Sequence, residues 1–474
     1  MHSFTWEPVV AENENRPETI ESSRGVADFE EAQAWLRARG IEDIECIVPD
    51  LAGVARGKMM PTEKFFSGPI MTMPASIFAQ TISGEYPEED ANFQHAPTDG
   101  DLFFQADYST LCTVPWETDP TAQLIHDAFT RDGDPVETAP RNVLKRVLAL
   151  YEKQGWKPVV APEIEFYLVK PNADPDYPLE PPIGRSGRPE VGRQSYSISA
   201  LNEFDELIDD IYDLSGAQGL EIDTLIHEEG AAQMEINLRH GDPLELADQV
   251  FLFKRTIREA ALRHNIYATF MAKPMSNQPA SAMHIHQSVL DVDNGNNIFS
   301  AADGTATEKF HAFIAGQQAY LPSVMCIMAP YVNSYRRYSR GSTSPVNIFW
   351  GHDNRTVGIR IPNSAPAGRR VENRLPSSDA NPYLAIATSL ACGYLGMTKN
   401  LTPDEPRTDD SSEIQSTLPR NLLDAVGMFA ECEDLFPLIG ERFIHTYRAI
   451  KETEYETFMS VISPWEREYL LLNV

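Results

Sequence analysis

The chain has 474 residues, of which 42% are hydrophobic, so it is long enough for two domains and a large buried core. Its formal net charge of −31 argues against nucleic acid or an anionic membrane as a partner, because both carry negative charge. Five scattered cysteines without a CxxC pair predict free thiols in the reducing cytoplasm rather than a disulfide framework or a zinc ribbon.

Composition and periodicity divide the N-terminal part of the chain into an arm and a first domain. Residues 1–25 are polar and charged, and are expected to form a flexible arm. A first domain is expected over residues 26–137. It begins with a helical pattern at 29–40, which ends at a glycine, and continues with a hairpin-like unit at 44–61. Another strand-rich stretch and a connector containing glycine and proline follow before the domain ends.

A second, larger domain is expected over residues 138–474. It opens with a strongly amphipathic helical pattern at 142–155. The Pro- and Gly-rich segment 171–193 is expected to be a long surface loop. Further helical patterns lie at 204–214 and 246–264 and, later in the chain, at 310–325 and across the C-terminal part. Strands mixed with helices predict an α+β fold.

Four short segments alternate apolar and ionisable residues with a period of two, as half-buried strands do. Each places its ionisable residues on one face and its apolar residues on the other. The four segments and these polar residues are 159–169 (Glu163, Glu165), 231–238 (Gln233, Glu235, Asn237), 281–289 (His284, His286) and 368–376 (Arg370, Glu372, Arg374). Any one of them is more often a solvated sheet face than a site. Together, the ionisable faces of the four strands favour a funnel-shaped cavity lined by polar side chains.

The chemistry of these residues indicates a metal-dependent reaction of anionic substrates. Carboxylates with one imidazole favour a hard divalent ion such as Mg²⁺ or Mn²⁺ over a structural Zn²⁺. Arginines beside them suit carboxylate and phosphate groups, which they bind through two parallel hydrogen bonds. Metals with arginines are what phosphoryl transfer requires. Because no Walker P-loop motif occurs, any ATP would be held in another way.

Seven segments of the chain together resemble one enzyme family. They are DLAGVARGK, APEIEFYLV, HEEGAAQMEIN, MHIHQS, NSYRRYSRG, NRTVGIRIP and GRRVENRLPSSDANPYLA. They occur in the order found in glutamine synthetases, and the resemblance covers nearly the whole chain after the N-terminal arm. It implies an N-terminal β-grasp domain followed by a catalytic domain with a curved antiparallel sheet. It also implies a homo-oligomer, a double-ring dodecamer, with active sites between neighbouring subunits.

The resemblance also implies roles for individual residues. One metal ion would be held by Glu165, Glu228 and Glu235, and the other by Glu163, His284 and Glu372. For Glu228 the adjacent Glu229 is an alternative. Glutamate would be bound by Arg337, Arg374 and Ala280. The transferring phosphate and the nucleotide would be bound by Arg355, Arg360, Arg370, His286 and Ser288. The attacking nitrogen would be bound by Asp50 of the neighbouring subunit. Arg337 and Arg355 are also expected to be catalytic, with Asp50.

The implied reaction has two steps, in which ATP phosphorylates the γ-carboxylate of glutamate and an amine then displaces phosphate. Three departures from the family bear on it. Thr343 stands near the position of a glutamate that ammonia-using members carry, so the ammonium site is weakened and a larger amine has room. Ala280 and Ala282 replace glycines, which disfavours a positive φ there. Thr402 replaces the tyrosine that is adenylylated in regulated members, so that control should be missing.

The segments NSYRRY, WGHDNRTV and ATFMAKP are similar to those of the family's polyamine ligases. The predicted reaction therefore joins glutamate to a polyamine. An acidic surface can attract such a cation, but taken alone the negative charge more often serves to keep a large protein soluble. An alkylammonium has a pKa of about 10, so the amine needs a base, for which Asp50 is the candidate and a turn aspartate the alternative. Thr343 and the acidic run at Glu85 are further amine-site candidates, although a run of this kind is more often a solvated loop. Alternatives are an ammonia-using glutamine synthetase, a ligase for ethanolamine or a monoamine, and a non-catalytic relative.

Overall fold

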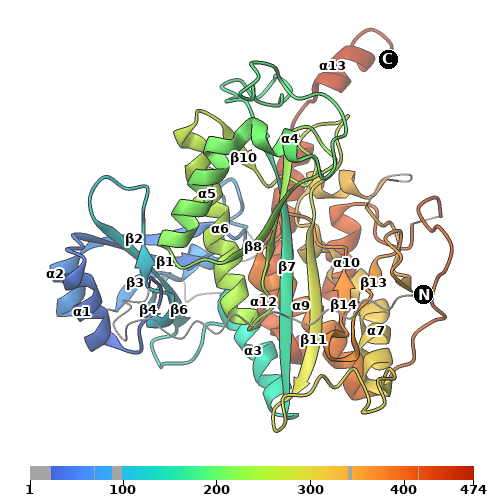
Figure 1. Cartoon of the computed structure of the whole chain (residues 1–474), viewed down its shortest axis with the longest axis horizontal. Coiled ribbons are helices and arrows are strands. Elements are labelled where there is room, and N and C mark those ends of the chain that lie inside the picture. Colours follow the sequence, from blue (N-terminus) through green and yellow to red (C-terminus); the bar gives the residue numbers. More distant parts are fainter. Residues whose placement is uncertain (1–22, 69, 88–98, 340–343, 415) are drawn as a thin grey trace, which may run out of the picture.

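The computed structural model describes residues 23–68, 70–87, 99–339, 344–414 and 416–474. Nearly all of the predicted N-terminal arm and the candidate Thr343 lie outside these ranges. Two sheets organise the molecule, and Figure 1 shows the smaller one at the left and the larger one near the centre. No helix within the described ranges combines the length and the apolar character that crossing a bilayer requires.

The smaller sheet has six strands in the order β2-β1-β6-β4-β3, with β5 beside β6. The pair β1–β6 is parallel, and the other pairs are antiparallel. Their bounds are β1 Asp43–Pro49, β2 Ala55–Pro61, β3 Met71–Pro74, β4 Asp101–Ala106, β5 Cys112–Thr113 and β6 Thr121–Phe129. The predicted hairpin is therefore present as β1 and β2.

Two helices pack on this sheet, α1 (Phe29–Ala38) and α2 (Thr62–Ser67). Asp28 caps α1 by accepting a hydrogen bond from the backbone N–H of Glu31, and Gly40 follows with a φ of 61°. The predicted helix is therefore present, and it ends next to the glycine that the sequence indicated. Apolar residues of both helices join the core of the smaller sheet, which is separate from the main core.

The larger sheet has eight strands in the order β12-β13-β14-β11-β7-β9-β8, with β10 beside β7. It is antiparallel except for the parallel pair β12–β13. Their bounds are β7 Trp156–Val169, β8 Ile222–His227, β9 Gln233–Leu238, β10 Tyr267–Thr269, β11 Met283–Asp291, β12 Trp350–His352, β13 Ile359–Ile361 and β14 Val371–Asn373. β14 is shorter than predicted, so Arg370 and Arg374 flank the strand instead of belonging to it.

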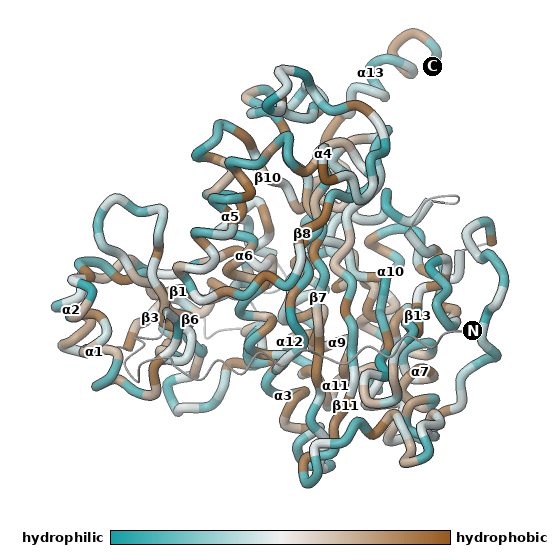
Figure 2. Tube along the Cα trace, viewed as in Figure 1, coloured by the Kyte–Doolittle hydropathy of each residue, from teal (hydrophilic) through white to brown (hydrophobic). Residues whose placement is uncertain are grey.

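Helices cover one face of the larger sheet and leave the other to the polar side chains. The main core joins the apolar faces of β7, β9 and β11 to these helices. In Figure 2 the alternation of hydrophobic and hydrophilic residues is visible along the central strands. The longer helices are α3 Pro140–Glu152, α5 Asp205–Ala217, α6 Pro243–Arg263, α7 Glu308–Tyr320, α9 Pro382–Lys399, α10 Leu422–Glu431 and α12 Glu441–Met459.

Local sequence signals set the ends of the core helices. Asp242 caps α6 by accepting from the N–H groups of Leu244 and Glu245, and Asn381 caps α9 in the same way. Proline follows each cap at the first helical position, where its fixed φ suits a helix start. Shorter helices are α4 Ile198–Leu201, α8 Met325–Met328, α11 Phe436–Ile439 and α13 Pro464–Leu470, the last of which extends away from the body (Figure 1).

The five cysteines have free thiols, as predicted. Four of them, Cys46, Cys112, Cys326 and Cys392, are buried, and Cys432 is half-buried. Burial raises the pKa of the Cys46 thiol to about 12, which keeps it protonated and unreactive. These side chains therefore serve as small apolar core residues.

Candidate active site

The register of the larger sheet places glutamate and histidine side chains from different strands opposite one another. Glu163 of β7 pairs with His284 of β11, while Glu165 of β7 pairs with Glu235 of β9. All four side chains line one cavity of about 600 Å³. The predicted polar faces of β7, β9 and β11 therefore face a common space.

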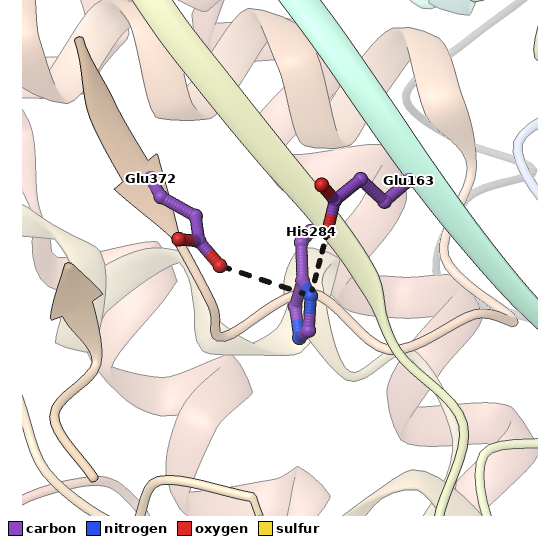
Figure 3. A group of neighbouring side chains, drawn as sticks. All are labelled: Glu163, His284 and Glu372. Carbon is purple, nitrogen blue, oxygen red and sulfur yellow. Dashed lines mark hydrogen bonds and ion pairs between the residues drawn. The ribbon is translucent and has the colours of Figure 1, made fainter. Parts of the chain in front are cut away.

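Glu163, His284 and Glu372 form the first group with metal-ligand geometry (Figure 3). Nδ1 of His284 lies 3.3 Å from a carboxylate oxygen of Glu163 and 3.9 Å from one of Glu372. One ligand atom from each residue fits within 4.8 Å of the other two. Three neighbouring strands, β7, β11 and β14, supply the three residues.

A second group with the same geometry consists of Glu165, Glu235 and His284. All three side chains are buried. Glu228, the predicted third ligand, follows β8 and lines the same cavity. In the described structure His284 therefore completes the group around Glu165 and Glu235, and Glu228 lies in the wall of the cavity.

Burial and mutual repulsion perturb the ionisation of these groups. Burial and the charge of Glu228 raise the pKa of Glu165 to about 8, and burial with the neighbouring glutamates raises that of Glu235 to about 10. Burial lowers the pKa of His284 to about 4, helped by Arg374. For Glu163 burial acts in the opposite direction, but hydrogen bonds from His284 and His286 lower its pKa.

These observations fit a divalent cation. Two carboxylates directly opposite in a sheet repel each other, and a bound cation removes that repulsion and favours their ionised forms. His284 is held neutral, as a metal-binding imidazole must be. Oxygen donors with one nitrogen are the set that Mg²⁺ and Mn²⁺ accept.

Four arginines line the cavity that holds these carboxylates. Arg337 is 1% exposed, and its guanidinium donates to the backbone oxygens of Leu375 at 2.6 Å and Arg374 at 2.9 Å. The guanidinium of Arg374 binds the Glu372 carboxylate. The two other lining arginines are Arg355, which is exposed, and Arg360. The cavity thus offers positive groups to anionic substrates beside the acidic clusters.

A second cavity of about 590 Å³ adjoins the first and shares Glu163 and Asn237 with it. His286, Ser288 and Arg370, three of the predicted nucleotide residues, line this second cavity. Nε of Arg370 donates to Nδ1 of His286 at 3.2 Å, and Nε2 of His286 lies 2.9 Å from Glu163. His286 therefore links Arg370 of the second cavity to Glu163, which lines both cavities.

Residues 137–470 match the family model described as glutamine synthetase, catalytic domain. The chain belongs to the glutamine synthetase family. This confirms the resemblance, the mixed helix-and-sheet fold with its curved sheet, and the prediction of a carbon–nitrogen ligase. Members of the family use ATP and divalent metals, which agrees with the donor set of the first cavity.

Relatives within the glutamine synthetase family cover almost the whole chain. The chain is 35% identical over 473 residues to gamma-glutamylputrescine synthetase PuuA of Escherichia coli (strain K12), covering 98% of this chain and 99% of that protein. It is 30% identical to glutamate–isopropylamine ligase of a Pseudomonas species, covering 91% and 95%. It is 33% identical to a glutamine synthetase of Thermococcus kodakarensis, covering 87% and 89%.

Solved structures of the glutamine synthetase family share the fold. "Apo GmaS without ligand" superposes with a TM-score of 0.77 at 28% identity, covering 93% of this chain and 99% of that one. The structure titled "GmaS/ADP complex-Conformation 1" gives the same values. The fold that contains the two cavities is therefore shared with solved members of the glutamine synthetase family.

The alanines that depart from the glutamine synthetase pattern keep ordinary backbone angles. Neither Ala280 nor Ala282 has a positive φ. Ala282 donates its N–H to Glu165 at 2.9 Å, and the carbonyl of Ala280 accepts from Nε2 of Gln233 at 3.1 Å. Both alanines line the first cavity. Backbone groups are thus still presented there without the left-handed conformation that glycine permits.

Asp50 lies in the turn between β1 and β2 and is 1% exposed. Its carboxylate accepts hydrogen bonds from the N–H groups of Ala52 and Val54 and from Nε of Arg56. This is the turn aspartate that the sequence left as the alternative reading. Among the described residues that line either cavity of this single chain, neither Asp50 nor the exposed Glu85 occurs. Their predicted roles in amine binding stay predictions.

Sequence reasoning missed several residues that shape the site. Gln233 was placed on a polar face without a role, yet its Nε2 lies 3.1 Å from a carboxylate oxygen of Glu165. Ser344 lines the first cavity beside the arginines. Glu190 reaches the segment before β9 from the long loop. The loop gave no periodic signal for such a contact, since it joins residues that are distant in sequence.

Proposed function

We propose that this chain joins the γ-carboxylate of glutamate to a primary amine of a polyamine, with ATP as the co-substrate. The observation that carries the proposal is the 35% identity over 98% of the chain to gamma-glutamylputrescine synthetase. The absence of a carboxylate at Thr343 agrees with an amine larger than ammonia.

Glutamate binds in the first cavity. Arg337 and Arg374 bind its carboxylates, and the carbonyl of Ala280 accepts from its amino group. Their positions support these roles, since all three residues line the cavity. Because the guanidinium of Arg337 is held by two backbone oxygens, its orientation is fixed before substrate arrives. Such preorganisation stabilises developing charge without reorganisation during the reaction.

ATP binds in the second cavity, where His286, Ser288 and Arg370 contact the nucleotide. Its γ-phosphate reaches the shared wall at Glu163. Arg355 and Arg360 extend from the first cavity and neutralise the phosphate that is transferred to glutamate. The similarity to a solved structure with bound ADP supports a nucleotide site in this fold.

Two Mg²⁺ or Mn²⁺ ions complete the site. Glu163, His284 and Glu372 hold one ion, and Glu165, Glu228 and Glu235 hold the other, with His284 between the two sets. Bound there, the ions supply charge neutralisation for phosphoryl transfer.

The amine attacks the γ-glutamyl phosphate, and phosphate leaves as the C–N bond forms. The attacking nitrogen must first lose a proton, because a primary alkylammonium with a pKa of about 10 is almost fully protonated near neutral pH. Asp50 of a neighbouring subunit is the proposed base. The domain division 26–137 and 138–474, a β-grasp fold for the first domain and a double-ring dodecamer belong to this proposal; a cytoplasmic location also stays a prediction.

The test is phosphate release from ATP with glutamate and Mg²⁺ across a set of amines. Putrescine is compared with butylamine, which has the same chain length but no distal ammonium, and with cadaverine, spermidine, spermine, ethanolamine and ammonium. Reactions without glutamate are the control. We expect one or more polyamines to stimulate release far more than ammonium does.

Each other outcome names a different function. Preference for ammonium would identify an ammonia-using glutamine synthetase. Preference for butylamine would favour a monoamine ligase, which the 30% identity to glutamate–isopropylamine ligase makes the second candidate. No stimulation by any amine would indicate a non-catalytic relative.

A further inference from the structure

Glu190 is a buried carboxylate in the long loop that follows β7. The loop lies at the top of the view in Figure 1, and most of its residues are exposed, whereas Glu190 is only 9% exposed. Its Oε2 accepts a hydrogen bond from the N–H of Ala232 at 2.7 Å and lies 3.1 Å from Nε2 of His227. Burying a carboxylate is costly unless it is bonded in this way. A loop residue thus holds the turn between β8 and β9.

The contact with His227 leads to Glu228. His227 is 1% exposed, and its Nδ1 lies 2.7 Å from the backbone oxygen of Glu228. The imidazole is therefore fixed at both ring nitrogens, by Glu190 on one side and by the backbone of Glu228 on the other. The position of Glu228 at the cavity thus depends on a bridge that begins in the loop.

The contact with Ala232 leads to Glu165. Ala232 has a φ of 57°, in the left-handed region that residues with a Cβ seldom adopt. The next residue, Gln233, donates from Nε2 to Glu165 at 3.1 Å, and its Oε1 accepts from the N–H of Gly230 at 2.9 Å. The bond from Ala232 to Glu190 holds this unusual conformation, which in turn directs Gln233 at Glu165.

The turn has little room to adjust. A Cβ at Gly230 would come within 1.9 Å of the hydroxyl oxygen of Tyr167 on β7, so the turn packs closely on that strand. The Tyr167 hydroxyl also lies 3.1 Å from Oε1 of Gln233. With the strand fixing one side of the turn, Glu190 fixes the other.

We propose that Glu190 is a positioning residue for the candidate metal cluster. It acts through His227 on Glu228 and through Ala232 and Gln233 on Glu165. The inference rests on the proposed function for its metal ions, whereas the contacts that carry it belong to the chain itself. Residues that hold metal ligands in place without touching the ion commonly change metal affinity 10- to 100-fold when removed.

The experiment compares Glu190→Ala and Glu190→Gln with the wild-type full-length chain. Glu180→Ala is the matched control, because Glu180 lies in the same loop but pairs with Lys170 and is exposed. Two quantities are measured: amide hydrogen exchange over residues 227–235 in metal-free protein, and Mn²⁺ affinity by titration calorimetry.

We expect Glu190→Ala to speed exchange at the Ala232 amide about tenfold or more and to weaken Mn²⁺ binding about tenfold. Glu190→Gln keeps an acceptor oxygen of the same reach, so its exchange and affinity should lie within about threefold of wild type. Glu180→Ala should change neither quantity. Should Glu190→Ala not fold, Glu190→Asp replaces it with the same expectation, since its carboxylate is drawn back by one methylene.

Unchanged exchange in the alanine variant, or an unchanged Mn²⁺ affinity, would overturn the inference. Equal losses in the alanine and glutamine variants would overturn it too, because hydrogen-bond positioning predicts rescue. If the wild-type chain bound no Mn²⁺, the metal sites of the proposed function would fail, while the exchange measurement would still decide the role of Glu190.

Discussion

Nη1 of Arg360 lies 2.8 Å from a carboxylate oxygen of Glu372, which is fully buried. The other oxygen of Glu372 binds the guanidinium of Arg374. Burial by itself would raise the pKa of Glu372. Nearby positive groups, above all Arg374, outweigh that effect and lower the pKa, so this carboxylate stays ionised. Glu372 therefore organises two arginines and one candidate metal site at once.

Replacing Glu372 by glutamine should affect both stability and turnover. Arg374 would lose its anionic partner in a buried position, and Arg360 would keep only Asp353, so we expect the melting temperature to fall by several degrees. Phosphate release with glutamate and amine should fall about 100-fold or more, because a metal ligand is lost as well. Glu405→Gln, at an exposed position, is the control and should change neither quantity. Wild-type values for Glu372→Gln would contradict this account.

Replacing Glu165 by glutamine should separate the metal role from the folding role. The change removes one of the carboxylates whose burial and repulsion raise the local pKa values, so the metal-free protein should be at least as stable as wild type. The gain in melting temperature on adding Mn²⁺ should shrink, and activity should collapse while the oligomer persists. Thermal melts, activity and gel filtration measure the three effects. Near-normal turnover would show that this face of β7 is structural.

The stability of the metal-free protein should depend on pH through Glu165. Its pKa is raised from 4.5 to about 8 in the folded protein by burial and the charge of Glu228. The folded state then binds a proton that the unfolded chain has released, so this contribution is complete below about pH 4.5 and is lost as pH rises through about 8.

Wild type should therefore lose stability relative to Glu165→Gln between about pH 6 and 8, on the order of 1 kcal/mol per pH unit. Urea unfolding of both proteins in chelator measures the difference. Saturating Mg²⁺ should abolish it, because a cation favours the ionised carboxylate in the folded state. Parallel pH profiles of the two metal-free proteins would refute the prediction.

Mixing two inactive variants should test whether sites form between subunits. Asp50→Asn removes the proposed base, and Glu165→Gln removes a metal ligand of the same proposed site. If each site combines Asp50 of one subunit with the cavity of its neighbour, mixed oligomers contain some sites with both residues intact. Co-expression of the two variants should then restore part of the activity.

Separately purified variants, combined without subunit exchange, are the control for this mixing and should stay inactive. If the co-expressed oligomers recover no activity, Asp50 has a structural role in the turn between β1 and β2 and no role in the site of a neighbouring subunit. In the single chain its carboxylate is already occupied by Ala52, Val54 and Arg56, so that outcome has a structural explanation.

Much of the fold could be predicted from local signals. Asp28 and Gly40 mark the ends of α1, and the alternation in β7, β9 and β11 predicts which side chains face the cavity. The prediction was less complete at β14, where the ladder covers only Val371–Asn373. Arg370 turns to the second cavity and Arg374 to the first. A period-two pattern alone could not separate them.

The sequence by itself determined which residues share a strand face, because side-chain alternation is a local property of the backbone. It also determined the family, through motifs spread over nearly the whole chain. Only the tertiary structure decided which faces meet: the register that sets Glu165 against Glu235, and the loop that brings Glu190 to Ala232. Such contacts join residues 42 to 70 positions apart, and depend on the packing of the whole sheet rather than on neighbouring residues.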